Sequence, residues 1–116
     1  MPDKEATLAA SQILEAVERI RAYLAGLDET AFLADGRTRD AVAMNLLVIG
    51  ENATRLPVDL RRQDTEFDWQ DAIALRHRIA HGYESLSFAV IWSIAIVELD
   101  GVEIAAERMI ARLEGL

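Results

Sequence analysis

Apolar residues recur at steps of three and four along most of this chain, and that spacing places them on one side of a helix. The first such stripe covers about residues 3–26, and a short helical turn or loop is expected over 28–35, ended by Gly36. The second stripe covers about residues 38–56 and stops at Pro57, since proline disfavours helix at the residue before it. Long helices are therefore expected to dominate the fold.

Two more helices are predicted in the second half of the chain. Asp68 has the position of an N-cap for a helix over about residues 69–80, with Gly82 as its C-terminal cap. Ser87 is expected to cap a last, continuous helix that runs to about Leu113. Between Pro57 and this region we expect only a short helical turn and a loop.

Length and composition agree with this pattern. The chain has 116 residues, which suits one domain over residues 1–116. Aromatic residues make up only 6%, and β-branched residues are interleaved with strong helix formers. The predicted fold class is all-α: an up-and-down helical bundle of four to five helices.

Two details of the helices point to close neighbours. Gly50 lies inside the second long helix, where a glycine often marks the close approach of another backbone. Residues 88–97 are apolar almost all round, although a surface helix in a small bundle needs only one apolar face. We interpret the extra apolar face as a partner surface and expect a homodimer.

The residue types exclude several classes of protein. The chain has no cysteine, which rules out disulfide scaffolds, cysteine-based zinc sites and thiol nucleophiles. The longest apolar stretch, residues 86–97, is too short to cross a membrane. The first residues are acidic where a signal peptide would be basic. We expect a cytoplasmic protein that has no contact with membranes.

The charge is unevenly distributed. The net charge of −8 argues against a protein that coats nucleic acid without specificity. Residues 37–83, however, hold seven of the twelve basic residues and both histidines. Any surface that meets an anion is expected to come from this middle part.

The segment Arg76-His77-Arg78-Ile79-Ala80-His81-Gly82-Tyr83 gathers the groups that could act on such an anion. Arg76 and His81 are five residues apart, so on an unbroken helix they point about 140° away from each other. Their convergence requires either that the helix ends near His81 or that a second copy of the motif lies across a two-fold axis.

The chemistry of this segment leaves three interpretations open. A histidine in the last turn of a helix is favoured in its protonated form, and an arginine nearby can stabilise charge on a phosphate. That combination suits metal-independent cleavage of RNA, with the 2′-hydroxyl as nucleophile. An arginine–histidine cluster at a helix end can also be an ordinary solvated cap. His77 and His81, at i and i+4, could instead bind a metal, but no third ligand is evident.

The order of these motifs resembles the HEPN-domain ribonuclease toxins of the HepT type. Arg76 to Tyr83 matches their R-x-x-x-x-H-x-Y signature, and Asn45 to Glu51 matches their N-L-x-x-I-G-E helix. Trp69 and the pair Ile91-Trp92 also fit, and the similarity covers about residues 5–110. His77 and Asn52 depart from the family, which often has Asn and Ala there.

The resemblance implies a specific function. The protein would be the toxin of a type II toxin–antitoxin pair, an endoribonuclease without metal or other cofactor that cleaves tRNA or mRNA. Arg76 and His81 would be the catalytic pair in a cleft shared by two chains. Tyr83 would accept AMP from a partner nucleotidyltransferase of the MNT type, the antitoxin.

The polar residues of the second long helix have a supporting role in this interpretation. Glu51 is expected to pair with Arg76 or Arg78, and Asn45 either helps to hold the motif arginines or makes an ordinary packing hydrogen bond. An alternative from another class also remains: a non-catalytic helical dimer that acts as a protein-interaction module.

Overall fold

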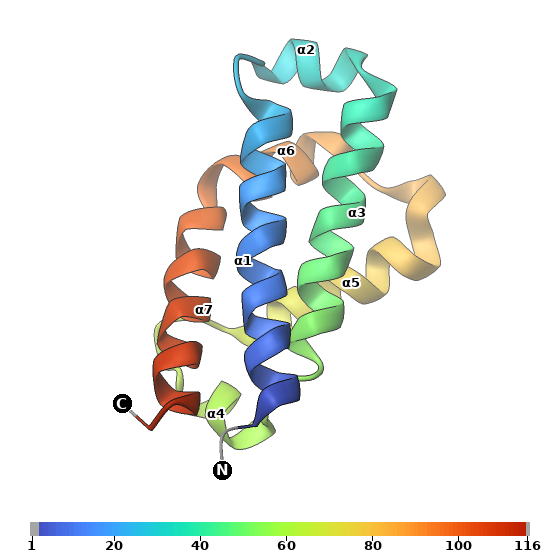
Figure 1. Cartoon of the computed structure of the whole chain (residues 1–116). Coiled ribbons are helices and arrows are strands. Elements are labelled where there is room, and N and C mark those ends of the chain that lie inside the picture. Colours follow the sequence, from blue (N-terminus) through green and yellow to red (C-terminus); the bar gives the residue numbers. More distant parts are fainter. Residues whose placement is uncertain (1–2, 116) are drawn as a thin grey trace.

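The computed structural model describes residues 3–115, which form seven α-helices and one 3-10 turn, with no strand among them (Figure 1). The elements are α1 (Lys4–Leu24), α2 (Glu29–Ala34), α3 (Gly36–Ala53), α4 (Val58–Gln63), α5 (Trp69–Gly82), η1 (Tyr83–Ser85), α6 (Phe88–Val97) and α7 (Leu99–Leu113). The all-α prediction is confirmed. The count of seven includes two six-residue helices, α2 and α4, in segments where only helical turns were expected.

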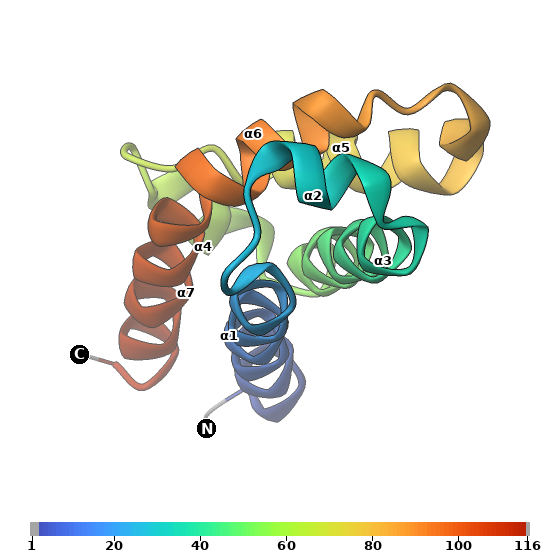
Figure 2. The same ribbon diagram turned by 90° about the horizontal axis from the view of Figure 1, so that it is seen from above.

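The long helices pack side by side around one core. Helix α1 lies between α3 and α7, and α3 also packs against α5. Seen from above, α1, α3 and α7 stand beside one another (Figure 2), while α2 bridges the upper ends of α1 and α3 and α6 crosses behind them (Figure 1). The core is made of the predicted apolar stripes, with Ile13, Ile20, Val42, Ile91 and Met109 almost fully buried.

Local sequence signals explain where most helices begin. Asp3, Asp28 and Asp35 each accept a hydrogen bond from a backbone N–H in the first turn of the helix that follows. The predicted N-caps Asp68 and Ser87 do the same, for the amides of Gln70 and Val90. These caps fix the start of α5, which carries the motif, and of α6, which lies across α2 and α3.

The last helix differs from the prediction. It was expected to run without a break from Ser87 to Leu113, but it is interrupted at Glu98, which separates α6 from α7. Helix α6 packs on α2 and α3, whereas α7 packs along α1. A straight helix could not cover both surfaces, so tertiary packing breaks a segment whose halves are each good helix formers.

Two glycines also have roles other than those predicted. Gly36 is the first residue of α3, whereas it was expected to end the preceding segment. Gly82 is the last residue of α5 with a φ of −145°, so it is not a left-handed C-terminal cap. Helix α5 therefore continues through His81, and a short 3-10 turn follows it directly.

The loop before α5 is fixed by a buried carboxylate. Asp64 accepts hydrogen bonds from the guanidinium of Arg108 on α7 and from the backbone amides of Glu66 and Phe67. Burial alone would raise the pKa of Asp64, but these hydrogen bonds lower it below its ordinary value. The ion pair joins α7 to the loop that leads into Asp68 and α5.

Gly50 is the point of closest contact between α3 and α5. A Cβ atom built there would lie 2.3 Å from the Cβ of Arg76 and 2.6 Å from the carbonyl oxygen of Ala72. The close approach expected from this glycine is present, and it occurs against the helix that carries the arginine of the motif.

Gly50→Ala is expected to lower the free energy of unfolding by about 1–3 kcal/mol, because the methyl group cannot fit between the two helices. This loss outweighs the gain of about 1 kcal/mol that alanine gives in a helix. Gly101→Ala in α7 is the matched control, since its Cβ would meet only Phe67 Cδ1 at 4.0 Å. Urea unfolding measures both. Equal stabilisation by the two substitutions would contradict the close contact.

Candidate active site

Helix α5 carries the basic motif on the outside of the bundle. His77, Arg78 and His81 are exposed, and Arg76 is partly buried against α3. Because α5 is helical through Gly82, Arg76 and His81 keep the divergent directions of an unbroken helix. Helix α5 does end near His81, at Gly82, but this end comes after His81 and does not turn its side chain toward Arg76. One chain therefore does not bring these two side chains together.

Arg76 is held by an acidic residue of α3. Its Nε donates a hydrogen bond to Oε2 of Glu51 at 2.6 Å. The ion pair expected with Arg76 or Arg78 is thus made with Arg76. Only Nε of the guanidinium is used in the described hydrogen bonds, so the two Nη groups remain able to contact an anion.

Asn45 does not hold a motif arginine. Its buried side chain donates from Nδ2 to the carbonyl oxygen of Ala41 and accepts from Nε of Arg19 at 2.8 Å. Asn45 therefore links α3 to α1, and the proposed support of the motif by this residue is wrong. The packing hydrogen bond was the other possibility considered from the sequence.

The two histidines lie next to each other along α5. The rings of His77 and His81 are tilted by 48° with their centroids 4.4 Å apart. Within residues 3–115, no group of three or more His, Asp or Glu side chains is arranged to hold a metal ion. The same residues include no helix that could span a membrane.

Tyr83 lies in the 3-10 turn directly after α5 and points back to α3. Its hydroxyl donates a hydrogen bond to Oδ1 of Asp40. Its ring meets the ring of Phe88 edge-on, at 5.9 Å between centroids, and the guanidinium of Arg39 lies 5.0 Å from the Phe88 centroid. Burial and the hydrogen bond to Asp40 raise the pKa of Tyr83 to about 12.

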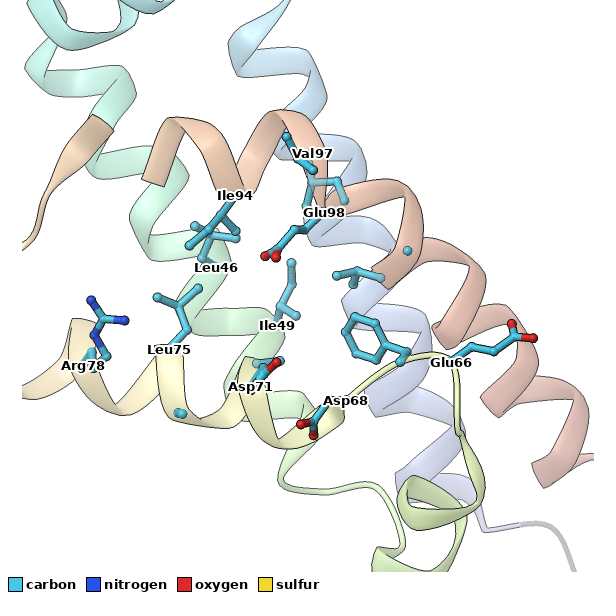
Figure 3. Close-up of a pocket in the computed structure, with 16 residues that line it drawn as sticks. Leu46, Ile49, Glu66, Asp68, Asp71, Leu75, Arg78, Ile94, Val97 and Glu98 are labelled. Carbon is cyan, nitrogen blue, oxygen red and sulfur yellow. The ribbon is translucent and has the colours of Figure 1, made fainter. Parts of the chain in front are cut away.

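A groove of about 470 Å³ runs beside the motif helix (Figure 3). Leu46 and Ile49 of α3 form its base, while Leu75 on α5 and Ile94 on α6 stand on its two sides. Arg78 lies at one end of this groove. Helices α5 and α6 pack on α3 rather than on each other, which leaves the groove open.

The rim of the groove is mostly acidic. The carboxylates of Asp68, Asp71 and Glu98 stand around it, and Val97 lies beside Glu98 on the same side (Figure 3). Val97 is 72% exposed and Ile96 is 56% exposed. The apolar surface predicted for residues 88–97 is therefore present on the outside of α6, next to the groove.

Comparison with known proteins identifies the family. The family model described as "Ribonuclease HepT-like" matches residues 13–109. The chain belongs to the HepT-like ribonuclease family.

Individual relatives agree with this membership. A candidate RNase of Methanocaldococcus jannaschii is 30% identical over 115 residues, which is 99% of this chain and 95% of that protein. A probable ribonuclease HepT of Thermococcus cleftensis is 31% identical over 80 residues, 69% of this chain and 73% of that protein. No solved structure matches the chain.

The structure of this HepT-like chain also shows residues that the sequence analysis did not connect with the motif. Arg39 and Asp40 contact the Phe88 and Tyr83 side chains from the first turns of α3. No local pattern signals these contacts, because Asp40 and Tyr83 are 43 residues apart in the sequence. Only the packing of α3 against α5 brings them together.

Proposed function

We propose that this HepT-like protein is the toxin of a type II toxin–antitoxin pair and acts as a metal-independent endoribonuclease on tRNA or mRNA. The observation that carries the proposal is the exposed arginine and histidine motif on α5, with Arg76 fixed by Glu51, in a chain of a ribonuclease family. Arg76 and His81 are the catalytic pair, and Arg78 and Glu51 support them.

Arg76 is suited to stabilise the negative charge that develops on a phosphate. The ion pair with Glu51 fixes the direction of the guanidinium before RNA binds, which reduces the cost of ordering it. The Arg76 side chain is 31% exposed, so its Nη groups are accessible to a phosphate. Charge-assisted hydrogen bonds from arginine to phosphate are among the strongest polar contacts.

His81 is suited to move the proton. Histidine changes its charge near neutral pH, so it can take the proton of the RNA 2′-hydroxyl or give one to the leaving 5′-oxygen. The 2′-oxygen then attacks the phosphorus, the bond to the 5′-oxygen breaks, and a 2′,3′-cyclic phosphate remains. No step of this route requires a metal ion.

A second copy of the chain completes the site in this proposal. Arg76 and His81 diverge within one chain, and a two-fold axis near α5 would allow Arg76 of one copy to meet His81 of the other. The open groove beside α5 and the exposed apolar face of α6 support this location for the interface. We therefore propose a homodimer.

Neutralisation by an MNT-type nucleotidyltransferase is the last part of the proposal. Tyr83 follows His81 after one residue and is 39% exposed, so a partner enzyme can reach it. An AMP group there would add a bulky negative charge beside the site and repel RNA. Neutralisation occurs by AMP transfer to Tyr83, by binding of the partner, or by both.

Arg76→Ala and His81→Ala are each expected to reduce RNA cleavage about 10²-fold or more. Both residues are partly or fully exposed, so thermal unfolding should stay close to that of the wild type. His77→Ala, one turn before His81, and Arg62→Ala, on exposed α4, are the matched controls with much smaller effects. The assay uses tRNA and mRNA in the presence of EDTA, and the products are tested for a 2′,3′-cyclic phosphate.

Three results would decide against parts of this mechanism. If both alanine variants stay as toxic to cells as the wild type, the non-catalytic interaction module replaces the ribonuclease. If EDTA abolishes cleavage and zinc restores it, the metal site at His77 and His81 is favoured. Products that end in a 3′-hydroxyl and a 5′-phosphate would exclude the 2′-hydroxyl as nucleophile.

Val97→Asp is expected to weaken the dimer, because it places a charge in the apolar surface next to the groove. Sedimentation of the wild type at micromolar concentration should give about twice 12.9 kDa. The control is Leu8→Asp, since Leu8 on α1 is 59% exposed but lies outside the groove and α6. A monomeric wild type, or equal effects of the two substitutions, would contradict this interface.

Tyr83→Phe is expected to prevent AMP transfer, because only the reacting hydroxyl is lost and the ring can still pack against Phe88. Cells that produce both proteins should then suffer from a toxin that escapes modification. The measurements are growth of such cells and transfer of radioactive label from ATP in vitro. Labelling of the Phe variant at the wild-type rate would show that another residue is the acceptor.

A further inference from the structure

The hydroxyl of Tyr83 is held by a contact that the proposed function does not use. Asp40, on α3, accepts the hydrogen bond of this hydroxyl. The Phe88 ring packs against the edge of the tyrosine ring, and Arg39 lies over Phe88. Groups from α3 and α6 thus fix the direction of the reacting oxygen, although Tyr83 stays accessible from solvent.

Packing gives no strong reason for a carboxylate at this position. Asp40 is exposed, and the hydrogen bond to Tyr83 is at the surface, where such bonds add little to stability. Asp40 also has no described ion pair within residues 3–115. The described side-chain hydrogen bond of Asp40 is therefore made with Oη of Tyr83, the oxygen that would be modified.

We propose that Asp40 is the proton acceptor for the transfer of AMP from ATP to Tyr83, an inference that rests on the proposed function. Oη of Tyr83 attacks the α-phosphorus of ATP, and a new O–P bond forms. The bond between the α-phosphorus and the bridging oxygen to the β-phosphate breaks, and pyrophosphate leaves with the electron pair. The proton of the phenol passes to Oδ1 of Asp40.

The electrostatics of Tyr83 show why such an acceptor is needed. Burial and the hydrogen bond to Asp40 raise the pKa of Tyr83 to about 12, and the positive charge of Arg39 offsets only part of this increase. Almost no phenolate exists near neutral pH, so the proton has to leave as the O–P bond forms. Protein kinases place an aspartate against the substrate hydroxyl for the same purpose.

Asp40→Asn separates the transfer of the proton from the placement of the hydroxyl. The amide oxygen of asparagine can still accept a hydrogen bond, but it cannot take the proton. Glu84→Gln is the matched control: Glu84 is adjacent to Tyr83 in the chain, exposed and of the same charge, and has no described hydrogen bond to the tyrosine hydroxyl. Thermal unfolding of both variants checks that the fold is kept.

The experiment measures initial rates of transfer from ATP labelled at the α-phosphate, using the full-length toxin and its partner nucleotidyltransferase. We expect Asp40→Asn to lower kcat about 10²-fold or more while KM for the toxin changes by less than about threefold. Between about pH 7 and 9, the rate of this variant should rise steeply, since hydroxide replaces the missing base. The rates of the wild type and of Glu84→Gln should not show this rise.

Each other result has a definite meaning. A loss in Asp40→Asn that is equal at every pH, or one confined to KM, would overturn the role in proton transfer. A wild-type rate in Asp40→Asn, or an equal loss in Glu84→Gln, would also overturn it. If Tyr83→Phe is still labelled, Tyr83 is not the residue that accepts AMP. If only Tyr83→Phe is unlabelled and Asp40→Asn behaves as the wild type, Tyr83 is the residue that accepts AMP and Asp40 does not take its proton.

Discussion

The missing side chain at Gly50 allows α3 and α5 to pack so closely that a methyl group would not fit between them. This contact fixes the helix that carries the motif. Glu51 is the next residue of α3, so the same contact brings its carboxylate to Arg76. Because α5 is held on α3 at this point, its other sides stay open toward the groove and toward solvent. The orientation of the candidate site thus depends on Gly50, which has no side chain that could take part in a reaction.

Features that depend on neighbouring residues were predictable from the sequence, and features that depend on distant packing were not. The caps Asp68 and Ser87 and the close contact at Gly50 follow from local patterns. The break at Glu98 does not, because α6 and α7 pack on different helices although both halves favour helix. The hydrogen bond from Arg19 to Asn45 was not predictable for the same reason, because it depends on the packing of α1 against α3. For the site, resemblance gave the motif, but the divergence of Arg76 and His81 within one chain follows from the full extent of α5.

An acidic protein that acts on RNA has to attract the RNA phosphates at a small part of its surface only. The net charge is −8, and at physiological salt the field of distant charges is screened beyond about 8 Å. In the proposed function, groups in contact with the phosphate then decide the interaction, and on α5 these are Arg76, Arg78 and His81. The surrounding carboxylates, including Asp71 and Glu98 at the groove, disfavour RNA elsewhere. In the proposed function, this distribution favours recognition by a few precise contacts over nonspecific binding.

In the proposed function, the end of α5 explains how catalysis and neutralisation can share one short segment. His81 lies on the last turn of the helix, beside His77. The backbone changes at Gly82 and enters a 3-10 turn, which directs Tyr83 to Asp40 instead of continuing the helical spiral. Two residues that are nearly adjacent in sequence therefore have different surroundings: His81 is at the exposed motif, and the hydroxyl of Tyr83 is held against a carboxylate. Modification of Tyr83 can then place negative charge next to the motif without requiring the helix that bears Arg76 to unfold.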